Sequence, residues 1–142
     1  MHPDAALGSS NNVINDNNWH HIAATCSAGG SIKLYTDGSE IINATAPQTN
    51  SSSSNINLSI GAKSANPSSN PPTVPFGGYL DEVAIFNREL TSSEIDKIRS
   101  SPYSYVGATS IYRFENNAND SVGTNNGTAN NGATFVTSEK PY

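Results

Sequence analysis

The chain has 142 residues, of which 35% are hydrophobic and 13% are charged, and its formal net charge at pH 7 is -5. This length is typical of one domain with a single core. The seven Lys and Arg residues are scattered and form no basic stripe, which excludes nucleic acid and anionic membrane surfaces as expected partners. Asn, Ser, Thr and Gly together make up almost half of the chain, a composition that favours strands and turns over helices.

Membrane insertion is not expected either. Residues 1–18 lack the basic start and apolar centre of a signal peptide, and no apolar run approaches the roughly 20 residues that a membrane-spanning helix needs. Any export signal is therefore expected outside this chain. Cys26 is the single cysteine, so no intrachain disulfide can form, and its strand-like surroundings predict a small buried side chain.

The first two structural predictions are a strand and a hairpin. Trp19–Cys26 is rich in β-forming residues and is followed by two glycines, and we expect Trp19 to pack in the core. The hairpin joins Ile32–Thr36 to Ser39–Ile42 through Asp37-Gly38. This dipeptide tolerates the positive φ angles of a two-residue type I′ turn.

Two further strands are predicted on either side of a proline-rich loop. Apolar and polar residues alternate in Ile56–Ile60, whereas Tyr79–Phe86 is largely apolar on both faces, which is typical of a central strand. Residues 66–75 between them contain prolines, which donate no ladder hydrogen bonds, so we expect a loop on a rim. Asp81 and Glu82 point to opposite faces, so one carboxylate is buried and needs a partner.

A short helix and two last strands complete the predicted elements. Thr91 and Glu94 have the spacing of a capping box, so a helix is expected near residues 92–100, and a proline discourages its continuation. Ile111–Glu115 and Ala133–Val136 are the final predicted strands. An Asn- and Gly-rich loop separates them.

Four motifs, in chain order, resemble the closing part of a laminin G-like, concanavalin A-like jelly-roll domain. They are Trp19–Thr25, Ile32–Gly38, Leu58–Ala62 and Gly78–Ile95. Residues 108–137, which contain Ala118-Asn119-Asp120-Ser121, resemble the opening part of the same family, although they follow the closing part in this chain. The resemblance implies an all-β fold: an antiparallel β-sandwich of concanavalin A-like jelly-roll type, truncated or circularly permuted, with one short helix.

The resemblance also predicts how the chain is organised. We expect a single β-sandwich domain over residues 1–142, built from the closing part at 11–100 and the opening part at 108–137. The middle strands of the family pattern are missing, so the opening part either folds back onto the same chain or completes a neighbouring copy. Because a truncated sandwich leaves unpaired edges, we expect a homo-oligomer formed through sheet edges.

Relatives of this fold often carry a structural calcium where the first and last strands meet, so the resemblance implies calcium as a candidate cofactor. The implied ligands are Asp81, Asn119, Asp120 and Glu115. Their side chains offer the hard oxygen atoms that calcium selects. In the alternative, Asn119 and Asp120 form an Asx-type turn. Asp81 then pairs with Arg88 or Arg113.

Sugar binding needs an aromatic face for stacking and polar groups that fix hydroxyls, usually on rim loops. The resemblance to lectins makes carbohydrate the first expected ligand, with a protein ligand as the alternative. The candidate ligand-binding residues are Phe76, Tyr79, Asn66 and Asn70. The competing interpretation is that both aromatic side chains pack in the core.

Catalysis is not expected. Glu94-Ile95-Asp96 resembles the start of the Glu-X-Asp-X-X-Glu motif of glucanases with this architecture, but Arg99 stands at the last position. The predicted helix also keeps the two carboxylates off the strand face that would flank a glycosidic bond. His20 and His21 are neighbours on a predicted strand, so they point to opposite faces and cannot share a metal.

Together these inferences predict a non-catalytic, lectin-like binding module that acts outside the cell or on a cell or virion surface. The rival hypothesis is a structural, self-assembling repeat segment of a larger surface or virion protein. The reversed order of the motifs favours the rival. The aromatic residues beside the proline-rich loop favour the lectin.

Overall fold

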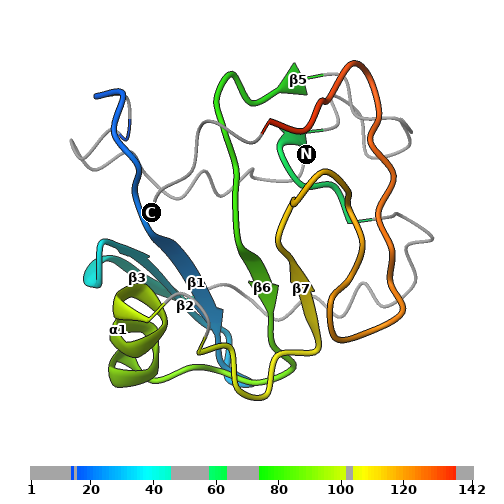
Figure 1. The fold of residues 1–142 in the computed structure, drawn as a ribbon. Coiled ribbons are helices and arrows are strands. Elements are labelled where there is room, and N and C mark those ends of the chain that lie inside the picture. The colour runs from blue at the N-terminus through cyan, green and yellow to red at the C-terminus, as the bar shows by residue number, and fades with distance from the viewer. Residues whose placement is uncertain (1–13, 15, 46–57, 64–73, 102–103, 137–142) are drawn as a thin grey trace, which may run out of the picture. The chain divides into compact units, whose positions relative to one another are not determined.

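The computed structural model describes residues 14, 16–45, 58–63, 74–101 and 104–136. Within these residues the chain forms strands in antiparallel sheets and one helix. In chain order the elements are β1 (Ile22–Cys26), β2 (Ser31–Thr36), β3 (Ser39–Thr45), β4 (Ala62–Lys63), β5 (Val74–Pro75), β6 (Val83–Ile85), α1 (Ser92–Ser100) and β7 (Ser110–Tyr112) (Figure 1). The predicted mixture of antiparallel strands with one short helix is confirmed, while the packing of sheets into a sandwich stays a prediction.

The chain divides into two compact units. The first unit contains residues 1–49 and 86–106, and the second contains residues 50–85 and 107–142. The first unit therefore holds the sheet β1-β2-β3 and α1, and the second holds the pairs β4-β5 and β6-β7. The expected single domain over residues 1–142 stays a prediction.

The β2-β3 hairpin forms as its sequence predicts. Asp37 and Gly38 have φ angles of 52° and 84°, and positive values at both positions are what a type I′ turn requires. The Asp96 carboxylate of α1 occupies the place where a side chain on residue 38 would lie. Glycine is therefore needed at this turn both for its backbone angle and for the close approach of the helix.

The capping box at the start of α1 is also confirmed. Thr91 Oγ1 accepts the Glu94 backbone N–H at 3.3 Å, and Glu94 Oε2 accepts the Thr91 N–H at 2.8 Å. Arg88 Nη2 lies 2.7 Å from Glu94 Oε1. One turn into the helix, Ile95 is 1% exposed and anchors α1 in the core of the first unit.

Three expectations at β1 are wrong. The strand begins at Ile22 rather than at Trp19, and the Trp19 side chain is exposed rather than packed in the core. Cys26 is exposed as well. Side chains alternate along a strand, and in β1 the inward face is the one that carries Thr25, so Cys26 falls on the outward face with Ala24.

In the second unit, β6 pairs with β7, so a strand of the predicted closing part is joined to a strand of the predicted opening part (Figure 1). The register places Val83 opposite Tyr112 and Ile85 opposite Ser110. All three residues of β7 are buried. The Tyr112 ring stacks on Phe114 at a centroid distance of 6.2 Å, which extends the apolar core beyond the strand.

The buried carboxylate predicted in this strand is that of Glu82. Its side chain is 9% exposed, and Arg113 Nη1 lies 3.1 Å from Glu82 Oε2. The prediction that such a carboxylate must have a partner is confirmed. Of the two arginines proposed for Asp81, Arg113 therefore contacts Glu82, and Arg88 contacts a carboxylate of the helix.

Several predicted strands are shorter than expected or absent. Glu82 has a φ of 49°, a left-handed backbone that does not continue a strand, so β6 covers only part of the predicted Tyr79–Phe86. Phe114, with a φ of 51°, lies just past the end of β7 and interrupts the predicted Ile111–Glu115 in the same way. Leu58–Ile60 and Ala133–Val136 are described but are not strands.

The proline-rich stretch is only in part a loop. Val74 and Pro75 form β5, which pairs with β4 in a two-stranded sheet. Both strands of such a sheet are edges, and an edge tolerates a proline that has no N–H to donate. The rest of this stretch up to residue 73, and Ile56 before it, lie outside the described residues.

Candidate functional site

Large apolar side chains are exposed around β4 and β5 in the second unit. This apolar patch consists of Leu58, Ile60, Val74, Phe76, Tyr79 and Leu80. Single exposed apolar residues are ordinary, but several in adjoining segments are typical of a site of interaction. The apolar patch is therefore the first candidate for a binding site, and it contains both aromatic residues predicted to bind a ligand.

Three short segments build the apolar patch. The β4-β5 pairing continues one residue further, because the Phe76 N–H donates to the Gly61 carbonyl at 2.8 Å. Leu80 Cδ1 lies 2.9 Å from the place where a Cβ atom on Gly61 would be. Gly61 thus brings the segment after β5 and the segment before β6 onto the same surface.

Phe76 and Tyr79 are 49% and 55% exposed, so neither is packed in the core. The competing interpretation of these aromatic residues is therefore wrong. The Phe76 ring lies across Gly78, with Cε1 2.7 Å from the position that a Cβ atom on Gly78 would take. The neighbouring Gly77 has no atom within 4 Å of the same position. Gly78 therefore leaves room for the ring, and Gly77 faces open space.

The apolar patch is uncharged. Residues 58–62 and 74–80 include no Asp, Glu, Lys or Arg, but Asp81 follows directly after Leu80, and Lys63 of β4 lies opposite Val74 of the patch. A surface of this composition suits the apolar C–H face of a neutral ring better than an ionic ligand. Asn66 and Asn70, the predicted polar partners, lie outside the described residues.

The Asp120 carboxylate, a predicted calcium ligand, is surrounded by hydrogen-bond donors. Its Oδ1 atom accepts the backbone N–H groups of Ile111, Val122 and Gly123 at 3.0, 3.2 and 3.0 Å. Its Oδ2 atom accepts the N–H of Asn125 at 3.3 Å. Burial opposes ionisation, but these donors outweigh it and hold the pKa of Asp120 well below its ordinary value. The contact with Val122 makes the Asx-type turn that the alternative interpretation predicted at Asp120.

These surroundings do not fit a calcium ion at Asp120, because N–H groups already face the oxygen lone pairs and repel a cation. Asp81 Oδ1 accepts the N–H of the next residue at 3.1 Å, and the Asn119 N–H donates to Asn117 Oδ1 at 2.8 Å. Glu115 is exposed. In the part of the chain that the structure describes, no three His, Cys, Asp or Glu side chains are grouped to hold a metal. Calcium binding stays a prediction.

Glu94 and Asp96, the two carboxylates of the sequence that resembles a glucanase motif, make structural contacts of the helix. Glu94 closes the capping box, and its hydrogen bond with Arg88 is the main reason why its pKa is lowered to about 2. Asp96 lies against the hairpin turn and pairs with Arg99, with 3.7 Å between Oδ1 and Nε. Glu94 is therefore not arranged as a general acid, which needs a raised pKa.

The first unit contains a polar pocket of about 360 Å³ that the sequence did not indicate. It is lined by Lys33, Tyr35, Glu40, Glu89, Leu90, Thr91 and Ser92. Its groups bond to one another: Lys33 Nζ lies 3.6 Å from Glu40 Oε2, and the Tyr35 hydroxyl donates to the same oxygen at 3.4 Å. Tyr35 is only 4% exposed and offers no stacking face. The residues of this pocket come from separate segments, so no local pattern reveals it.

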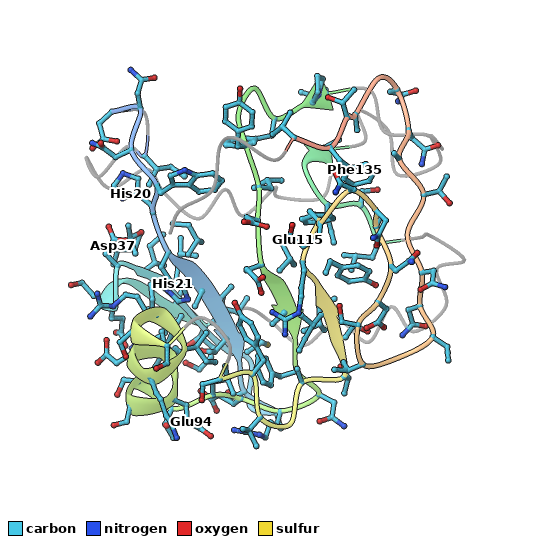
Figure 2. The ribbon with its side chains drawn as sticks, viewed as in Figure 1. His20, His21, Asp37, Glu94, Glu115 and Phe135 are labelled. Carbon is cyan, nitrogen blue, oxygen red and sulfur yellow. The ribbon has the colours of Figure 1, made fainter. Side chains whose placement is uncertain are left out.

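A second group of side chains in the first unit was also not predicted from the sequence. The His20 ring lies between two carboxylates, with Nδ1 2.8 Å from Asp37 Oδ2 and Nε2 2.9 Å from Asp16 Oδ1 (Figure 2). The hydrogen bonds with Asp37 and Asp16 raise the pKa of His20. The pKa of His21 moves the other way, because burial and the Arg99 charge lower it.

Comparisons with known proteins agree with the predicted resemblance. A profile of the Laminin_G_3 family, described as concanavalin A-like lectin/glucanases superfamily, matches residues 2–96. No curated protein sequence gave a significant match. The 2.1 Å crystal structure of an S-layer domain-containing protein (residues 221–444) from Clostridium thermocellum ATCC 27405 aligns with a TM-score of 0.46 and 27% identity. That alignment covers 65% of this chain and 42% of the other, so the chain spans less than half of that structure.

The family match ends inside α1, so it contains most of the predicted closing part and leaves out residues 108–137. The resemblance of those residues to an opening part stays a prediction. In the part of the chain that the structure describes, there is no helix whose length and apolar character would let it cross a membrane.

Proposed function

Because the chain belongs to the Laminin_G_3 family of the concanavalin A-like lectin/glucanases superfamily, we propose that it is a non-catalytic carbohydrate-binding module. The ligand stacks on Phe76 and Tyr79. The observation that carries this proposal is the exposure of both aromatic side chains, 49% and 55%, in the adjoining segments of the apolar patch. Aromatic rings bind the apolar faces of sugars, and this is the usual basis of sugar recognition at an open surface.

The proposed ligand is a neutral oligosaccharide. Acidic sugars are bound best by clusters of Lys and Arg, and residues 58–63 and 74–80 contain a single such residue, Lys63 opposite Val74. The net charge of -5 also disfavours anionic glycans over the whole chain. Such glycans are displayed outside cells, so we place the module at a cell or virion surface, and this part of the proposal rests on the family alone.

The absence of catalysis is part of the proposal. A glycosidase needs one carboxylic acid that stays protonated near neutral pH and a second carboxylate across the bond. Glu94, with a pKa lowered to about 2, is ionised and engaged in the helix cap. We expect no release of reducing ends from neutral glucans.

Self-assembly is the second candidate function. The sheets β4-β5 and β6-β7 each have two strands among the described residues, so β4, β5 and β6 each lie at an edge, whereas the other side of β7 is bonded to Asp120 and Ser121. Edges of this kind pair readily with a second copy of the chain. The apolar patch lies beside β4-β5, and burying it in a homo-oligomer would remove it from water. A protein ligand at the same patch would act in the same way.

A glycan array followed by titration tests the proposal. The array is screened with the purified chain in calcium and again in chelator, and the best neutral oligosaccharide is then titrated by calorimetry. We expect Phe76→Ala and Tyr79→Ala each to weaken binding roughly tenfold or more, because each removes a stacking face. Val122→Ala is the matched control, since Val122 is an exposed apolar residue of the same unit, outside the apolar patch.

The same variants distinguish the two functions. If no glycan binds while the chain forms an oligomer that Phe76→Ala dissociates, self-assembly is the function and the lectin proposal is wrong. If Phe76→Ala unfolds the chain, as judged by circular dichroism, the ring is structural despite its exposure. Binding that persists in chelator would separate sugar recognition from any calcium site.

A further inference from the structure

Three side chains of the first unit form what we call the His20 clamp: Asp16, His20 and Asp37. Asp16 lies in the segment before β1, and Asp37 lies in the turn between β2 and β3. The His20 ring bridges them, with hydrogen-bond distances of 2.8 Å to Asp37 and 2.9 Å to Asp16 (Figure 2). The clamp therefore connects two parts of the chain that β1 and β2 separate.

Both contacts depend on the charge of the ring. An ionised carboxylate only accepts hydrogen bonds, so each ring nitrogen that faces one must carry a proton. The imidazolium form donates from both nitrogens, whereas neutral imidazole donates from one and turns a lone pair toward the other carboxylate. Two carboxylates at these distances can both be satisfied only by protonated His20.

We propose that the His20 clamp is a pH-sensitive strap: protonated His20 holds Asp16, at the start of the segment before β1, against the β2-β3 turn, and deprotonation releases Asp16 while His21 stays bonded to the turn.

Asp16 is the carboxylate that leaves. Asp37 is held by the turn and by its own second oxygen, since Oδ1 accepts the His21 backbone N–H at 2.9 Å. The other contacts of Asp16 are within its own segment, where Oδ1 accepts the Asn18 N–H at 3.0 Å and Oδ2 accepts the Asn18 side-chain amide at 2.8 Å. A neutral ring that keeps its hydrogen bond to Asp37 therefore has no N–H left for Asp16.

Other charged groups near the clamp do not replace it. His21 follows His20 directly and lies near Asp96 and Arg99 of α1, as well as near Asp37. Because burial and Arg99 lower the pKa of His21, this residue is neutral at a pH where His20 is still protonated. The pKa of His20 thus lies above the ordinary histidine pKa, and the pKa of His21 lies below it.

The pH range of the clamp follows from these directions. The pKa of His20 is raised, so its stabilisation is complete below the ordinary value of about 6.5 and is lost as the pH rises through the folded pKa. The pKa values of Asp16 and Asp37 are lowered, so their stabilisation is present above about 4 and is lost as the pH falls through their folded values. The strap is therefore closed in mildly acidic solution and opens as the pH rises through the raised pKa of His20.

Trp19 makes the strap measurable. It is the one tryptophan of the chain and lies between Asp16 and His20 in sequence, so its fluorescence reports on this segment. The wild-type chain should show a fluorescence transition above pH 6.5, and the His20 ring should titrate with the same midpoint by nuclear magnetic resonance. Asp16→Asn should move that midpoint downward, and His20→Gln should abolish the fluorescence transition. His21→Gln is the matched control and should leave both signals in place.

Two results would overturn the proposal. One is a His20 resonance that titrates at or below the ordinary value in the wild-type chain. The other is a fluorescence transition that survives His20→Gln. If His20→Gln does not fold, Asp16→Asn still decides the matter, because it keeps the ring and the turn and removes one carboxylate charge.

Discussion

Asp120 shows how one carboxylate can organise a segment that has little regular structure. It links β7, through the Ile111 N–H, to the loop that follows, through the N–H groups of Val122, Gly123 and Asn125. An isolated bridge joins Asp120 itself to Tyr112. The side chain takes the place of a neighbouring strand for these amides, which would otherwise need other acceptors.

Replacing this carboxylate tests its role. We expect Asp120→Asn to lower the melting temperature at neutral pH, because the amide has only one oxygen and no charge to offer the N–H donors. The pKa of Asp120 is lowered, so its stabilisation is present above about pH 4 and is lost as the pH falls through the folded value. The melting curves of the two chains should therefore converge in acid. Glu115→Gln, at an exposed carboxylate, is the control; equal melting temperatures for Asp120→Asn and wild type at pH 7 would refute this role.

Gly77 and Gly78 offer a residue-scale test of the binding site. A methyl group at Gly78 meets the Phe76 ring, whereas one at Gly77 meets nothing within 4 Å. We expect Gly78→Ala to displace the ring and weaken sugar binding several-fold, and Gly77→Ala to bind as the wild type does. Calorimetric titration of a neutral oligosaccharide measures both. Equal affinities for the two variants would show that the ring position does not matter.

Among the elements, α1 depends most clearly on local contacts. Its capping box satisfies backbone N–H groups that a helix start otherwise leaves unpaired. We expect Thr91→Ala to lower the free energy of unfolding by about 1 kcal/mol, since it removes the side-chain acceptor. Urea denaturation measures this change, and Ser93→Ala, one helix position beyond the first, is the control. No difference between the two variants would mean that the cap contributes nothing to stability.

The same locality explains which elements could be predicted from the sequence. The helix start and the Asp37-Gly38 turn depend on residues a few positions apart, and both were predicted correctly. The inward face of β1 depends on what packs against it, so the exposure of Trp19 and Cys26 could not be read from the chain. Glu82 and Phe114 adopt positive φ angles, which are uncommon for these residue types and were not predicted. Each of them interrupts a predicted strand.

The residues of the candidate site could also be predicted only in part from the sequence. Aromatic residues beside a proline-rich stretch pointed to Phe76 and Tyr79, but only the structure shows that they are exposed. The Asx-type turn at Asp120 was a stated alternative, whereas its four N–H donors come partly from another strand. The His20 clamp joins residues that are 17 and 4 positions apart, and no motif predicts it.

At the scale of the whole molecule, the pairing of β6 with β7 bears on how the two predicted parts, which occur in reversed order along the chain, are combined. The predicted closing part and the predicted opening part contribute one strand each to this pair, within one chain. This is the arrangement that the fold-back route requires of these two strands, without a neighbouring copy. The family match stops at residue 96, before β7 begins.

A shortened chain tests this organisation. Removing residues 107–142 takes away β7, which leaves β6 without its partner and the second unit without Ile111 and Tyr112 of its core. We expect the chain 1–106 to melt at a lower temperature, to aggregate more and to lose sugar binding. Adding the fragment 107–142 in trans should restore binding in part. If chain 1–106 keeps the wild-type melting temperature, the matched residues fold without β7.

The most direct test of the central claim is a glycan array probed in parallel with the wild-type chain and with the double variant Phe76→Ala, Tyr79→Ala. The account predicts that the wild type binds a related set of neutral oligosaccharides and few acidic ones. It also predicts that the double variant, folded as judged by circular dichroism, binds none of them. A wild-type chain that binds no glycan, or a double variant that binds as the wild type does, would contradict the proposal that this uncharged aromatic surface recognises sugars.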